Sequence, residues 1–155
     1  IYLFGSYAKN INREESDIKG GVIFMTIQEK IVNYFRNKKP KLIYLFGSYA
    51  KNINREESDI DIAILLETPM NIKEKFKYKM QLVDLLGKEV DLIDLSDANI
   101  ILKHQIVTTG NNLFYRTKLE KDEFEYGVIS CYYQYRDDIE IVKKSIKKRG
   151  YVWKK

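Results

Sequence analysis

The stretch Ser58-Asp-Ile-Asp-Ile-Ala-Ile-Leu-Leu66 constrains the fold of this chain more than any other. It has the length of one β-strand and is apolar on one face throughout, which is typical of a strand in the middle of a sheet. Residues two apart in a strand point to the same face, so Asp59 and Asp61 project together. Two neighbouring carboxylates repel each other unless a cation lies between them. The stretch therefore predicts a central strand that begins at a cation site.

Two helices around this strand have clear start and stop signals. Thr26 and Glu29 form a capping-box pattern, which predicts a helix from about Thr26 to Lys38 that Pro40 ends. Asn71 is expected to cap a second helix that Gly87 closes. That helix should bury one apolar side, made of Ile72, Phe76, Met80, Val83 and Leu86.

The other elements follow without a regular alternation of strands and helices. We expect strands at 42–46, 89–95 and 113–115, and a helix that Ser96 caps and that reaches Thr109. Residues 118–149 should be mostly helical, with Gly127 as a weak point. Such an order predicts an α+β (mixed α/β) domain rather than a doubly wound parallel sheet.

A third carboxylate and a Gly-Ser turn complete the candidate site. Asp91 lies in a strand, Val90-Asp-Leu-Ile-Asp-Leu95, that would pair beside the strand of Asp61. Hard oxygen ligands of this kind suit Mg²⁺, which leaves places for substrate phosphates and water. Gly47 and Ser48 end the preceding strand, where exposed N–H groups and a hydroxyl would hold phosphate oxygens. No GxxxxGK[ST] or GxGxxG pattern occurs, so this turn is the phosphate-binding candidate.

The order GSYAK, then SDIDI, then VDLIDL resembles the DNA polymerase β-like nucleotidyltransferase superfamily, and most closely its minimal nucleotidyltransferase (MNT) family. The resemblance covers Met25 to about Arg136 and implies a small mixed sheet flanked by helices, with a long C-terminal helix. It implies that Gly47 and Ser48 bind the nucleotide triphosphate. It also implies that Asp59, Asp61 and Asp91 ligate two Mg²⁺ ions, and that Asp91 helps to deprotonate the attacking hydroxyl.

One segment departs from the family pattern. Lys51-Asn52 stands where family members often have Arg-Gly. Lysine keeps the positive charge, so Lys51 stays a nucleotide-binding candidate, but it loses the bidentate phosphate geometry of arginine. The departure bears on substrate affinity more than on the type of reaction.

In the MNT family the partner is commonly a HEPN-domain protein that resembles an RNase toxin. The resemblance therefore implies an antitoxin that transfers AMP from ATP to a tyrosine of a HEPN partner, in a hetero-oligomer. A binding-only antitoxin and an aminoglycoside-type nucleotidyltransferase are the alternatives. A basic chain of this length offers neither the acidic pocket nor the extra domain that an aminoglycoside enzyme needs. RNA as the acceptor is possible but not favoured.

The first 24 residues partly duplicate the site. Residues 1–18 repeat residues 43–60 letter for letter, but Lys19 stands where the second copy has Asp61. The first copy also lacks a third strand, so we expect it to be catalytically silent. We therefore expect residues 1–24 to be a duplicated fragment, and residues 25–155 to be the nucleotidyltransferase domain with a helical tail.

The remaining features favour structural or surface roles. A 45% hydrophobic and 32% charged composition is typical of a globular protein, and the single cysteine, Cys131, suits a reducing cytoplasm. No apolar run reaches membrane-spanning length. We expect the one histidine, His104, to have a structural role on a helix rather than a catalytic one. The basic end from Lys143 onward is interpreted as a solvated helix end, with a surface for an acidic protein partner or for RNA as the alternative. The tyrosines Tyr132, Tyr133 and Tyr135 are expected first to pack against a helix, and the long C-terminal helix that carries them is the candidate docking surface.

Overall fold

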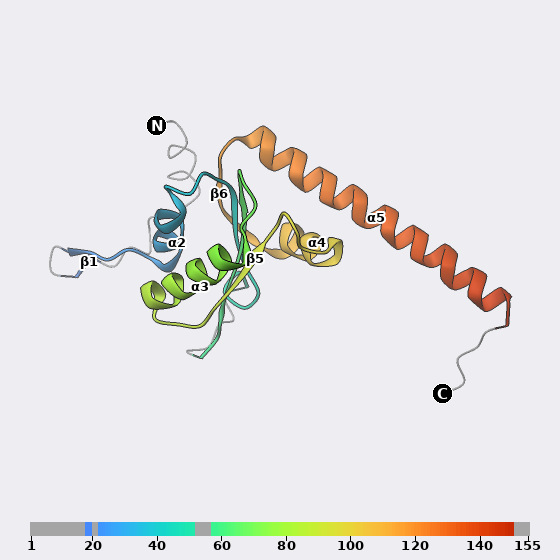
Figure 1. Cartoon of the computed structure of the whole chain (residues 1–155), viewed down its shortest axis with the longest axis horizontal. Coiled ribbons are helices and arrows are strands. Elements are labelled where there is room, and N and C mark those ends of the chain that lie inside the picture. Colours follow the sequence, from blue (N-terminus) through green and yellow to red (C-terminus); the bar gives the residue numbers. More distant parts are fainter. Residues whose placement is uncertain (1–17, 20–21, 52–56, 151–155) are drawn as a thin grey trace.

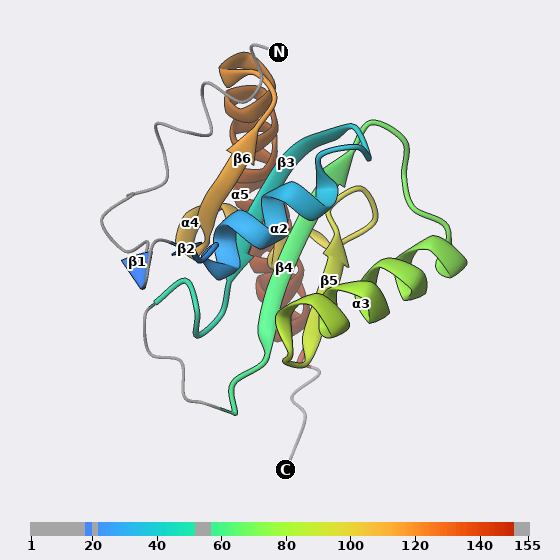
Figure 2. The same ribbon diagram turned by 90° about the vertical axis from the view of Figure 1, so that its left-hand side faces the viewer.

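The computed structural model describes residues 18–19, 22–51 and 57–150. Its centre is a four-stranded sheet in the order β5-β4-β3-β6. The strands are β3 (Pro40–Phe46), β4 (Ile60–Leu66), β5 (Val90–Asp94) and β6 (Asn111–Tyr115). β3 runs antiparallel to β4 and β6, whereas β4 and β5 are parallel. β4 has a neighbour on both sides, which confirms the central strand predicted from its apolar sequence (Figure 2).

Helices cover both faces of this sheet. The helices α2 (Ile27–Phe35) and α3 (Ile72–Leu86) lie on one face, and α4 (Ile100–Thr109) and α5 (Lys118–Lys148) lie on the other (Figure 1). Because side chains alternate along a strand, each face has its own core. Ile43 and Ile62 belong to the core under α2 and α3, and Tyr44 and Ala63 to the core under α4 and α5. The α+β class with a mixed sheet and a long C-terminal helix is confirmed.

The helix termini follow the predicted capping signals closely. Thr26 Oγ1 accepts from the N–H of Glu29 at 3.2 Å, and the Glu29 carboxylate accepts from the N–H of Thr26 at 3.0 Å. Asn71 forms the same box at the start of α3, and Gly87 ends α3 in the left-handed region at φ 67°. The first helix ends at Phe35, before the predicted Lys38, and Pro40 opens the strand β3 instead.

The predicted cap of α4 was wrong. Asn99, not Ser96, accepts from the N–H of Leu102 and starts the helix at Ile100. Ser96 is held by the buried carboxylate of Asp94, which accepts from its N–H at 2.8 Å and from its hydroxyl at 2.6 Å. A serine in this turn satisfies a strand-end aspartate and is not free to cap the next helix.

The predicted apolar side of α3 was wrong for its first half. The side chains of Ile72 and Phe76 are 88% and 66% exposed, and Met80 is exposed as well. The buried stripe lies beside this row and is centred on Leu82, which is completely buried. Contact with α2 decides which side of α3 is buried. The ring of Tyr78 in α3 packs edge-on against the ring of Phe35 in α2, with centroids 6.3 Å apart.

Helix α5 has the predicted extent and is more regular than expected. It runs for 31 residues, and Gly127 interrupts nothing, so the predicted weak point was wrong. At 1.5 Å per residue it is about 46 Å long, more than the sheet can cover. Its first half lies against the sheet and α4, and its second half projects away from the domain (Figure 1).

Ahead of α2, the strands β1 (Ile18–Lys19) and β2 (Val22–Ile23) form a separate two-stranded ladder. Residues 1–17, which make up most of the first copy, lie outside the described residues. Within the described part of the chain, no helix combines the length and hydrophobicity that a bilayer crossing requires.

Candidate active site

The register of the sheet brings two of the predicted carboxylates together. Asp61 of β4 is the direct partner of Asp91 in the parallel strand β5, and of Phe46 in β3. Adjacent strands lie about 4.8 Å apart, so in-register side chains on one face are neighbours. Asp61 and Asp91 share the face of Ala63 and Ile93, which is the face that α4 and α5 cover. Asp61 and Asp91, which the sequence predicted on adjacent strands, therefore lie side by side in the structure.

Burial and charge act together on Asp61. Its side chain is half-buried, whereas Asp59 and Asp91 are exposed. Burial raises the pKa of the Asp61 carboxyl above its ordinary value of 3.8, and the charges of Asp91 and Asp59 raise it further. All three carboxylates thus act on one another, with Asp61 as the inner member. A bound cation would stabilise this group of carboxylates, because it would offset the repulsion between their charges.

The Gly-Ser turn lies directly beside this group. Gly47 follows the last residue of β3 and has a φ of 69°, a conformation that side chains rarely adopt. A Cβ built on Gly47 would overlap Oδ2 of Asp61 and come within 3.1 Å of its Cγ. The turn can therefore follow this path only because residue 47 has no side chain. Ser48 is half-buried in the turn, and its hydroxyl and N–H belong to the same edge of the sheet.

Lys51 ends the described part of the turn and is exposed. Its neighbour Asn52, where the family pattern departs, lies outside the described residues. The structure thus brings Gly47, Asp61 and Asp91 together, and leaves Lys51 at the rim.

A second lysine near the site was missed by sequence reasoning. The Nζ of Lys88 lies 5.5 Å from the centre of the Tyr49 ring, and Tyr49 follows Ser48. Lys88 lies two residues before Val90, the first residue of the strand of Asp91, and this position was the signal that would have found it. Because Tyr49 packs against the core under α2 and α3, this cation lies near the turn but on the sheet face opposite to the carboxylates.

The donor set fits Mg²⁺ in the manner of a nucleotide site. In the described ranges, no three His, Cys, Asp or Glu side chains are arranged to hold a metal ion by themselves. Mg²⁺ is usually held by one or two carboxylates, with substrate phosphates and waters supplying the other ligands. The pair Asp61 and Asp91, with Asp59 at the entrance, offers that incomplete shell.

His104 has the structural role expected of it. Its ring stacks on Tyr132 of α5, with centroids 3.7 Å apart and planes inclined by 11°. The packing role expected of the tyrosine patch holds for Tyr132, which is half-buried, but Tyr133 and Tyr135 are exposed.

A mixed sheet that carries a glycine turn beside two in-register aspartates defines a nucleotidyltransferase of the polymerase β type. The family model described as "Polymerase beta, Nucleotidyltransferase" matches residues 29–119, which is more than half of the chain. The chain belongs to this family, as the resemblance in its motifs predicted. The match includes Gly47, Ser48, Asp59, Asp61 and Asp91, and the first copy lies outside it.

One similar protein and two similar solved structures specify the relationship within this family. The protein adenylyltransferase MntA of Shewanella oneidensis is 36% identical over 107 residues, which are 68% of this chain and 76% of MntA. A toxin–antitoxin crystal structure with AMP-PNP has a chain with a TM-score of 0.70 and 31% identity, covering 77% of this chain and 98% of that chain. A structure of the tri-AMPylated Shewanella oneidensis HEPN toxin with an MNT antitoxin gives a TM-score of 0.65 and 30% identity, covering 78% of this chain and 96% of that chain. The predicted relationship to MNT proteins is confirmed.

Proposed function

We propose that this nucleotidyltransferase is an Mg²⁺-dependent antitoxin that transfers AMP from ATP to a tyrosine of a HEPN-domain toxin in the cytoplasm. The observation that carries the proposal is the register of Asp61 with Asp91 beside the Gly47 turn. The similar proteins support the choice of reaction, because one is a protein adenylyltransferase and another is an antitoxin bound to an AMPylated toxin. The AMP-PNP complex supports ATP as the nucleotide donor.

Each residue of the site has a role that follows from its position. The backbone N–H groups of the turn at Gly47 and the hydroxyl of Ser48 hold the triphosphate, and Lys51 adds charge at the rim. Asp59, Asp61 and Asp91 hold two Mg²⁺ ions, which when bound supply charge neutralisation around the transferred phosphate.

The transfer exchanges one phosphate ester for another. The tyrosine oxygen forms a bond to the α-phosphorus of ATP, and the bond from that phosphorus to pyrophosphate breaks. The proton of the tyrosine hydroxyl passes to Asp91, which is exposed at the open side of the site. The chain contributes position and charge rather than a covalent intermediate.

The decisive experiment is the intact mass of a HEPN-domain toxin, after incubation with the chain, ATP and Mg²⁺. We expect a gain of one or more AMP units, lost when EDTA is added. An Asp59→Ala/Asp61→Ala variant should give no gain. Asp84→Ala, on the exposed side of α3, is the matched control and should act as the wild type.

Two outcomes would contradict the proposal. A toxin that is silenced without any mass gain would identify a binding-only antitoxin. A mass gain on RNA or on an aminoglycoside instead of the protein would reassign the acceptor.

The proposal assigns the activity to residues 25–155 alone. A chain that starts at Met25 should transfer AMP at the wild-type rate, because the first copy has Lys19 in place of the second metal aspartate. A large loss on truncation would give the duplicated fragment a role in the site.

A further inference from the structure

The apolar residues of α5 recur with the spacing of a coiled coil. Val128, Tyr132, Tyr135, Ile139, Val142 and Ile146 follow one another at steps of four and three residues. Such a 3.5-residue repeat forms one continuous seam on a helix and is made to receive a second helix. We call these six residues the α5 seam.

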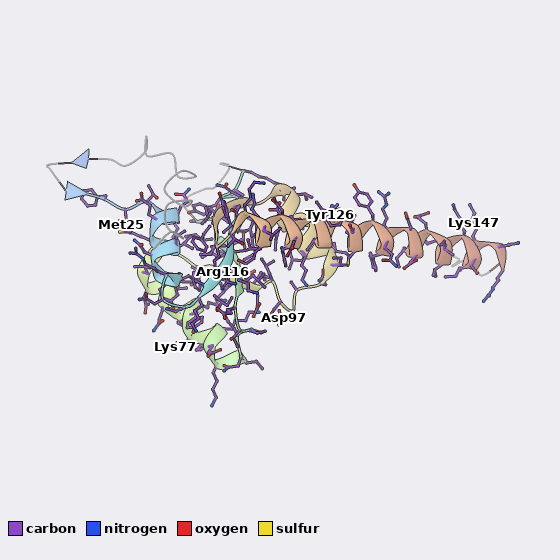
Figure 3. All side chains as sticks on the ribbon, turned by 90° about the horizontal axis from the view of Figure 1, so that it is seen from above. Met25, Lys77, Asp97, Arg116, Tyr126 and Lys147 are labelled. Carbon is purple, nitrogen blue, oxygen red and sulfur yellow. The ribbon has the colours of Figure 1, made fainter. Side chains whose placement is uncertain are left out.

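Helix α4 fills only the beginning of the α5 seam. Val128 is buried, and Tyr132 stacks on His104 of α4. Further along, Val142 is 52% exposed and Ile146 is 41% exposed, and Tyr135 is exposed as well. Figure 3 shows this part of the helix, up to Lys147, projecting beyond the body of the domain. The seam therefore continues past the element that covers it.

The α5 seam and the active site lie on the same side of the sheet. Its covered part faces α4, and α4 and α5 lie on the sheet face onto which Asp61 and Asp91 project. In Figures 1 and 2, α5 leaves the domain on that side and descends toward the level at which β4 begins. A helix that continued the seam after α4 would lie on the sheet face onto which the carboxylates project.

We propose that the exposed part of the α5 seam, Tyr135 to Ile146, binds a helix of the protein that accepts AMP and so presents that protein to the site. This inference rests on the proposed function, because it names the docking surface for the same acceptor.

Charge at the edge of the seam specifies the chemistry of the occupant. Arg136 and Lys143 occupy equivalent positions along one edge of the seam, seven residues apart, and Asp138 lies along the other edge. Lys143 also forms an exposed ion pair with Glu140 of the same helix at 3.5 Å. Lys147, Lys148 and Arg149 add positive charge at the tip of α5. The matching helix must carry an apolar stripe with acidic residues along one side, since opposite charges at these flanking positions select the partner.

A second copy of this chain does not meet that requirement. An antiparallel pair of α5 helices would set Arg136 of one copy against Lys143 of the other, which is a like-charge contact. A parallel pair would bring the two α4 helices to the same end of the seam, where each already covers Val128 and Tyr132.

The test compares two neighbouring exposed residues of α5. Val142→Asp/Ile146→Asp places charges in the seam, and Ile141→Asp places one beside it, at a residue that is 65% exposed. Isothermal titration of each variant against the same HEPN-domain toxin, without ATP, measures docking alone. We expect the seam variant to bind at least about tenfold more weakly, and the Ile141 variant within about threefold of the wild type. Circular dichroism checks that α5 remains helical in both.

Charge reversal supplies a second, independent variant. Arg136→Glu/Lys143→Glu should also weaken binding, and the loss should shrink as salt is raised. Equal affinity of the wild type and the seam variant overturns the inference, as does equal loss in the seam and Ile141 variants. Failure of the wild-type chain to bind, or a homodimer in sedimentation that the seam variant abolishes, overturns it too. Binding that depends on the seam without any AMP transfer would instead contradict the proposed function alone.

Discussion

The backbone of Gly47 lies against the carboxylate of Asp61, with no room for a single methyl group between them. Gly47 opens the turn that follows β3 and Asp61 is the second residue of β4, so the contact joins the phosphate-binding candidate to the innermost carboxylate. Neither can move without displacing the other.

We expect Gly47→Ala to reduce AMP transfer by about a hundredfold or more. The new Cβ would overlap Oδ2 of Asp61, and a displacement of about 1 Å at such a site costs on the order of a hundredfold in rate. The measurement is the initial rate of mass gain on the HEPN protein at saturating ATP.

Gly87→Ala is the matched control for this substitution. Gly87 has nearly the same φ, 67°, but nothing lies within 4 Å of its Cβ position. Both variants should lose about 1–2 kcal/mol of unfolding free energy from the left-handed backbone. Only the Gly47 variant should lose activity; equal activity losses would mean that backbone strain, and not the contact with Asp61, matters.

The repulsion around Asp61 predicts a pH-dependent effect on stability without metal. The pKa of Asp61 is raised in the folded state, so the unfolded chain releases this proton first as the pH rises. The group therefore costs stability above its folded pKa, and costs nothing below the ordinary value of 3.8. In EDTA at pH 7, Asp61→Asn should stabilise the fold by less than about 1 kcal/mol, since partial exposure screens the effect.

Thermal melts from pH 3 to pH 7 measure this difference. The gain should shrink as the pH falls, and Asp84→Asn, which removes an exposed carboxylate, should show no comparable gain. Added Mg²⁺ and ATP should reverse the order and favour the wild type. A gain that stays constant down to pH 3 would contradict the electrostatic origin.

The elements that local residues determine were predictable from the sequence, and those set by packing were not. Thr26, Asn71 and Gly87 act within one turn of their own helix, so their caps were predicted correctly. The pairing of Asp61 with Asp91 followed from strand periodicity and motif order. The exposed side of α3 at Ile72 and Phe76 depends on where α2 lies, which no local pattern contains. The turn at Ser96 depends on Asp94 in the same way.

Asp94 is expected to stabilise the fold rather than to take part in catalysis. It points away from the face of Asp61, is 3% exposed, and accepts from the N–H of Met70 at 3.0 Å as well as from Ser96. Asp94→Ala leaves these donors unsatisfied and should cost about 2–4 kcal/mol of unfolding free energy. Urea denaturation measures the loss. Asp94→Asn keeps one acceptor oxygen and should cost less, while both variants should transfer AMP normally below their unfolding temperature.

The hydrogen bond between Tyr44 and Glu125 should hold α5 on the sheet. The Tyr44 hydroxyl donates to Oε1 of Glu125 at 2.5 Å, and burial together with this bond raises the pKa of Tyr44 far above its ordinary value. Tyr44→Phe removes the donor and leaves the carboxylate with Lys121, whose Nζ is 4.0 Å away. We expect a loss of about 1–2 kcal/mol. In urea denaturation, Tyr44→Phe and Glu125→Ala, which removes the acceptor, should cost clearly less together than the sum of the two single losses; strict additivity would mean that the bond does not anchor α5.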